Sequence, residues 1–134
     1  MAHEYEINAA LNEHLVSMPD VPPIAWPNAK FDPVGSPVWF EVAQLPRIID
    51  APFLGNDSSQ DYGGIYQVSV MTTLGQYETA ALQAADELIN HFERGIILRS
   101  GDTYVRIRNA YRSPGLVDGS RYAIPVSIRY RTVL

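Results

Sequence analysis

The sequence contains no cysteine, only one lysine and no long apolar run. Without cysteine, disulfide bonds and thiolate chemistry are excluded, which fits folding in a cytoplasm. No apolar run approaches the roughly 18 residues of a membrane span, so we expect no membrane association. The N-terminus is acidic, with Glu4 and Glu6, and no basic start precedes an apolar stretch. We therefore expect no secretion signal.

Residue patterns that would indicate catalysis are also missing. His14 lies on the apolar side of an expected helix, where a packed residue is more common than a base. His91 follows Glu87 by four residues, which is typical of a solvated helix pair, and a metal site needs more ligands. No serine lies in a Gly-x-Ser-x-Gly motif, and no glycine pattern would hold phosphate. We expect no enzymatic activity, no cofactor and no metal.

The composition is that of a globular protein. The chain has 134 residues, of which 46% are hydrophobic and 19% are charged. This is too apolar for a disordered chain. A chain of this size buries about 68% of the surface that it exposes when unfolded, which allows one core. We predict one domain over residues 1–134.

Apolar periodicity predicts two helices and five strands. Steps of three and four residues indicate helices over 3–17 and 76–94, whereas alternation indicates strands. The strands are expected over 38–45, 64–73, 96–99, 104–109 and 121–131. The order α-β-β-α-β-β-β predicts an α+β domain, in which two helices pack on one face of a mainly antiparallel mixed sheet. Pro125 cannot donate to a ladder and predicts an edge or a bulge.

A proline-rich segment separates the first helix from the first strand. Residues 19–37 hold six of the ten prolines. Because proline fixes φ and has no backbone donor, this segment is expected to be an extended arm. Ile24, Trp26 and Phe31 are expected to pin the arm to the core, since a disordered linker rarely carries such residues.

Two segments, 46–63 and 111–120, are rich in turn-forming residues and are expected to be loops. Asp57 and Asp61 have neither the spacing nor the terminal glutamate of a calcium loop, so a mobile surface loop is the better interpretation. Such loops can become ordered on a partner. We include Asp57, Asp61 and Arg112 among the candidate interface residues.

The charge of the chain is unevenly distributed. Residues 1–93 hold 13 acids and 2 bases, whereas residues 94–134 hold 2 acids and 8 arginines. This asymmetry favours an interaction surface. An equally open interpretation is that basic strands fold beside acidic helices within one subunit.

Four arginines are expected on one face of the sheet. Arg106 and Arg108 alternate with apolar residues along one strand, and Arg129 and Arg131 do so along another. In regular strands these side chains point away from the core. With Tyr104 nearby, this face could bind nucleic acid.

An acidic pI of about 5.0 and the shortage of lysine instead favour a protein partner for this face. Arginine with tyrosine is also the composition of protein interfaces. The expected partners of the arginines are acids such as Asp86 and Glu87, or Glu4 and Glu6, on the same or the next subunit.

Several short segments occur in an order typical of one protein family. They are PPIAWPN at 22–28, the spaced Phe31, Pro33, Gly35 and Pro37, YGGIYQVSV at 62–70, AADEL at 84–88, FERG at 92–95 and YAIPVSIRYR at 122–131. In this ordered set the sequence resembles the phage tail terminator-like family, small proteins encoded among the tail genes of siphophages and prophages. The resemblance covers nearly the whole chain.

The resemblance implies an α+β subunit that forms a hexameric ring. The ring would sit on the finished tail tube, stop its growth and present a surface to the head-tail connector protein, while DNA passes through without specific binding. The protein would assemble in the host cytoplasm and end in the virion tail.

A ring closed by head-to-tail contacts needs two different patches on each subunit. The acidic front and the basic end of the chain can supply them. Two alternatives stay open, a head-completion or neck connector protein and a small ligand-binding or enzymatic domain.

Overall fold

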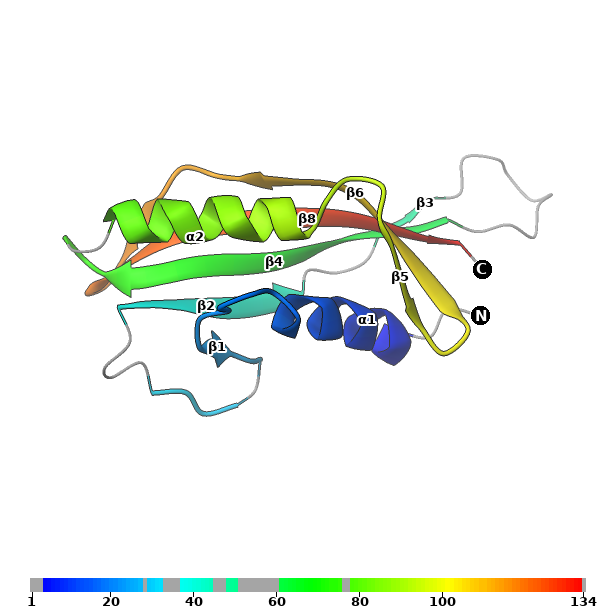
Figure 1. Cartoon of the computed structure of the whole chain (residues 1–134), viewed down its shortest axis with the longest axis horizontal. Helices are drawn as coiled ribbons and strands as arrows, with labels where there is room; N and C mark the ends of the chain where they lie inside the picture. The colour runs from blue at the N-terminus through cyan, green and yellow to red at the C-terminus, as the bar shows by residue number, and fades with distance from the viewer. Residues whose placement is uncertain are drawn as a thin grey trace.

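The computed structural model describes residues 4–27, 29–32, 37–44, 48–50, 61–75 and 78–133. Within these ranges the chain forms two helices and eight strands (Figure 1). The helices are α1 (Glu4–Val16) and α2 (Glu78–His91). The strands are β1 (Ile24–Ala25), β2 (Val38–Gln44), β3 (Ile48–Asp50), β4 (Asp61–Thr73), β5 (Ile97–Ser100), β6 (Thr103–Arg112), β7 (Leu116–Asp118) and β8 (Arg121–Val133).

The strands form one sheet in the order β1-β2-β4-β8-β6-β5, with β3 beside β4 and β7 beside β8. All pairs are antiparallel except β1 with β2, which is parallel. The two longest strands, β4 and β8, pair along their full length at the centre. The expected α+β fold with a mainly antiparallel mixed sheet is confirmed.

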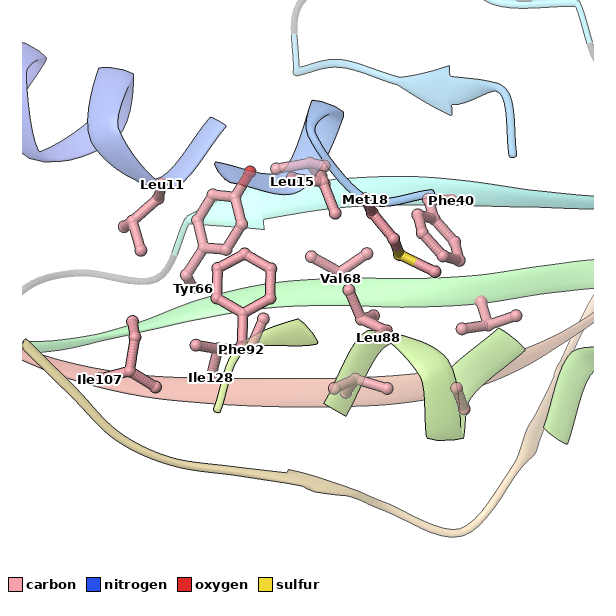
Figure 2. Close-up of a cluster of buried hydrophobic side chains, with 14 of the residues drawn as sticks. Leu11, Leu15, Met18, Phe40, Tyr66, Val68, Leu88, Phe92, Ile107 and Ile128 are labelled. Carbon is pink, nitrogen blue, oxygen red and sulfur yellow. The ribbon is translucent and has the colours of Figure 1, made fainter. Parts of the chain in front are cut away.

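Both helices pack on one face of the curled sheet, which we call the inner face (Figure 1). Even-numbered side chains of β4 and β8 point toward this face because the strands alternate regularly. Figure 2 shows how the helices and strands share one core, in which Leu11 and Leu15 of α1 face Tyr66 and Val68 of β4. Phe92, just after α2, is only 1% exposed at its centre.

The arm is anchored by the three side chains that the sequence predicts. Ile24 and Trp26 pack against the inner-face core, and β1 adds two residues to the edge at β2. Phe31 instead packs on the opposite side of the sheet, against a small cluster of Trp39, Met71 and Ala123. The arm therefore passes around the β2 edge from one face to the other.

Two sequence-based expectations about the connections are wrong. The expected loop 46–63 contains β3 and the first residues of β4, and the expected loop 111–120 contains the end of β6 and all of β7. Gly63 and Gly64 weaken the local strand signal, but pairing with the long β8 extends β4 back to Asp61. Turn-forming residues become strand here because a neighbouring strand supplies their hydrogen bonds.

Pro125 lies in a central strand, which corrects the expectation of an edge. On one side β4 pairs with it at Ser69. On the other side, pairing with β6 ends at Val126 and pairing with β7 begins at Ala123. The Ser113 N–H donates to the Pro125 carbonyl at 2.8 Å, so the missing proline N–H falls in this gap, where no ladder bond is lost.

Candidate interaction face

We call the side of the sheet opposite the helices the outer face, and among the described residues a segment covers it at one end only. Phe31 of the arm closes the end at Trp39, and the Arg121 guanidinium lies 5.7 Å from the Trp39 ring centroid. A hollow of about 300 Å³ lies beside it, lined in part by Trp26 and Glu41. Farther along β8 the outer face is not covered by either helix (Figure 1).

The four predicted arginines lie together at the uncovered end of the outer face. Arg106 of β6 is directly opposite Arg131 of β8, and Arg129 is directly opposite Asn109. Arg108 lies at a β-bulge, where β6 has one more residue than β8. Directly opposite residues of an antiparallel pair point to the same face, so Arg106, Arg129 and Arg131 share the outer face. Arg108 lines the same hollow as Arg106 and Arg131.

The sequence reasoning missed a fifth arginine. Arg94, Arg106, Arg108 and Arg131 line a hollow of about 370 Å³, which also includes Ile107. Arg94 reaches it because the connection from α2 to β5 runs along β6. The Gly95 N–H donates to the Ile107 carbonyl at 2.8 Å. Gly95 has a φ of 92°, which favours glycine and turns the chain here.

This hollow, which we call the arginine hollow, concentrates charge of one sign. Arg94, Arg106 and Arg108 are exposed and have no ion pair with any residue that the structure describes. A guanidinium group offers only donors, in a fork that matches carboxylate or phosphate oxygens. The hollow can therefore bind an anion, but its side chains offer no nucleophile and no general base at neutral pH.

The other predicted interface residues are Asp57, Asp61 and Arg112. Asp57 lies outside the described residues. The backbone of Asp61 is part of β4, opposite Asp50 and Val133, so its placement in a loop is wrong. Arg112 is the last residue of β6 rather than a loop residue, and it lies opposite the buried Val126. It therefore points to the inner face, away from the four arginines.

The acids named as possible partners fall into two groups. Glu6 is used within the subunit, because its Oε2 accepts a hydrogen bond from the Asp102 N–H at 3.3 Å, in the turn between β5 and β6. The side chain of Glu4 lies outside the described part. Asp86 and Glu87 are exposed on α2.

The two histidines on the helices meet, which the sequence reasoning did not foresee. The rings of His14 and His91 stack with centroids 4.0 Å apart. Each Nε2 lies at hydrogen-bond distance from the carbonyl of the other, 2.7 Å for His14 and 2.6 Å for His91. Burial lowers the pKa of His14, and the nearby His91 lowers it further, while the hydrogen bond to the His91 carbonyl acts in the opposite direction.

This histidine pair joins the C-terminal turns of α1 and α2 against Phe92. It is a packing contact. Within the described residues, no group of three or more histidines, aspartates or glutamates is placed to hold a metal. In the same part of the chain, neither helix is long and apolar enough to cross a membrane.

Residues 6–130 match the family described as phage tail terminator protein. The chain belongs to this family. The match covers nearly the whole sequence, so the resemblance inferred from the ordered motifs is confirmed.

Solved structures show the same fold. One, of a protein without a descriptive name, is 25% identical, with a TM-score of 0.76, over 98% of this chain and 96% of the other. A chain from the virion of a native gene transfer agent particle is 14% identical, with a TM-score of 0.68, over 99% of this chain and 98% of the other. No curated protein sequence matches the chain at a significant level.

Membership in the phage tail terminator family supports a phage structural protein. The family name describes a structural role, and this name alone supports the expectation that the chain is not an enzyme.

Proposed function

We propose that this protein is a ring-forming tail terminator. It caps the tail tube, stops the polymerisation of the tube and provides the surface that the head-tail connector protein joins. Membership in the tail terminator family over residues 6–130 carries this proposal. Assembly takes place in the host cytoplasm, and the finished ring belongs to the virion tail.

The fold suits a ring subunit. The long β4–β8 pair forms a stiff centre, and the helices close the inner face, so the core does not depend on a partner. The open outer face with its arginines is then available for contacts between proteins. Two unlike surfaces on one subunit favour a heterologous interface, which closes into a ring when the rotation fits.

DNA passes through such a ring without specific binding. Each subunit carries a formal charge of −5, and six subunits would carry −30. An acidic or neutral lining suits a conduit, because clustered arginines would hold phosphates by counterion release and slow the passage of DNA. The arginines are therefore expected to contact another protein rather than DNA.

The test is a tube-growth assay. Purified tail tube subunits polymerise in the presence or absence of the protein, and electron microscopy measures tube length and inspects tube ends. We expect shorter tubes, each with a ring at one end. The number of ring-capped tube ends should rise with the amount of protein added. Tubes of unchanged length without rings would contradict the proposal. Binding to DNA-filled heads instead of tubes would assign the neck position.

A further inference from the structure

We infer that the arginine hollow receives the acidic side chains Asp86 and Glu87 of α2 from a neighbouring copy of this chain. The inference rests on the proposed ring, and it names the two surfaces that meet in it. Each surface carries charges that form no ion pair with any described residue: Asp86 and Glu87 on the helix, and Arg94, Arg106 and Arg108 at the hollow.

The acidic surface is the exposed side of α2. Asp86 and Glu87 lie in the C-terminal half of the helix, where the helix dipole does not favour acids. No lysine or arginine lies three or four residues from either, and the one base in reach, His91, directs its Nε2 to the His14 carbonyl. Neither acid forms an ion pair with any described residue.

The basic surface also carries unpaired charges, because Arg94, Arg106 and Arg108 form no ion pair with any described residue. Arg106 lies directly opposite Arg131 across β6 and β8, and like charges in this position repel. Arg94 and Arg108 add two more positive charges at the same hollow. Anionic groups entering the hollow would relieve this repulsion, and carboxylates match the guanidinium fork.

As the chain is folded, the acids of α2 and the arginines of the hollow in one copy do not form ion pairs with each other. No ion pair joins Asp86 or Glu87 to an arginine among the described residues, although the hollow begins only a few residues after α2. Unlike patches of opposite sign on one rigid subunit complement each other between copies, in a head-to-tail contact. A volume of about 370 Å³ leaves room for the two carboxylate heads.

The experiment uses reversed charges on each surface separately. One variant carries Arg106→Glu and Arg108→Glu, and the other carries Asp86→Lys and Glu87→Lys. All four side chains are exposed, so folding should be retained, which circular dichroism and thermal melting check. Matched controls are Lys30→Glu and Glu13→Lys, which reverse exposed charges outside the two surfaces. Sedimentation velocity and electron microscopy measure ring formation.

Wild type and both controls should form rings. Each double variant alone should associate at least about 100-fold more weakly, as expected when close interfacial charge pairs become repulsive. An equimolar mixture of the two variants should form rings again, because the acidic hollow of one then meets the basic helix of the other. This recovery requires each subunit to supply both surfaces.

Normal rings from either double variant alone would overturn the inference. So would loss of rings without recovery in the mixture, since the surfaces would then have other partners. If the arginine variant forms normal rings but loses affinity for short duplex DNA at physiological salt, the hollow binds nucleic acid instead. Failure of wild type to form rings under every condition would contradict the proposed function itself.

Discussion

The inner and outer faces of the same two strands, β4 and β8, differ in almost every respect. On the inner face, Val68 and Ile128 are fully buried beneath the helices. On the outer face, Gln67 and Ser127 are half-buried and Arg129 is exposed. Successive residues of one strand thus differ in their surroundings: Val68 and Ile128 hold the core, whereas the exposed Arg129 is accessible to another protein.

The largest expected loss of stability comes from a substitution in the inner-face core. Phe92→Ala removes a ring that is 1% exposed and contacts Tyr66 and His14, so we expect a loss of about 3–5 kcal/mol in the free energy of unfolding. The matched control is Phe31→Ala on the outer face, where the ring is half-buried and a loss of about 1 kcal/mol is expected. Urea unfolding measures both. Equal losses would show that the two faces do not differ in this way.

A smaller effect should follow from adding one methyl group to the inner face. The Tyr130 ring lies over Gly64, directly opposite on β8, and a Cβ at Gly64 would lie 2.6 Å from Tyr130 Cζ. Tyr130 is buried and cannot move aside without disturbing the core, so Gly64→Ala should cost about 1–3 kcal/mol.

The control for Gly64→Ala is the same substitution in a Tyr130→Ala background, where the space is empty. There the added methyl should be tolerated or should stabilise the strand. Thermal melting of the four proteins gives the coupling, and additive losses would argue against the contact.

The smallest expected effect concerns the histidine pair at the edge of the inner-face core. The pKa of His14 is lower in the folded chain than its ordinary value of about 6.5, mainly because the ring is partly buried. As the pH falls through this value, the unfolded chain binds the proton first, so stability decreases, and it is recovered as the pH rises.

His14→Gln keeps a donor for the His91 carbonyl but removes the titration. Urea unfolding between pH 7.5 and 5 should show a weaker loss of stability for this variant than for wild type. An identical slope in both proteins would mean that His14 does not contribute to the pH dependence.

Much of the fold follows from local patterns. The positions of α1, α2, β2 and β6 agree with the expected ranges to within a few residues at each end. Segments with turn-forming residues were the exception. With three residues each, β3 and β7 are too short to show the alternation of apolar and polar residues that indicates a strand. They are strands only because they pair with the neighbouring β4 and β8.

For the candidate site, alternation correctly placed Arg106, Arg108, Arg129 and Arg131 on one face. Alternation could not indicate Arg94, which lies outside any strand. Arg112 was expected in a loop, whereas it is the last residue of β6. The bulge at Arg108 shifts the alternation by one residue, so Arg112 points to the opposite face. One inserted residue reverses the face to which every later side chain of the strand points. No local sequence pattern indicates where such a bulge lies.

The sequence by itself determined the fold class, the two sides of each long strand and the separation of charge along the chain, because these depend on spacing and composition. Only the tertiary structure decided which residues meet. It brought His14 to His91 across 77 positions of sequence and Arg94 to Arg106 and Arg131. Such contacts depend on strand order, register and the path of the connections, which arise from the packing of the whole core rather than from any segment of it.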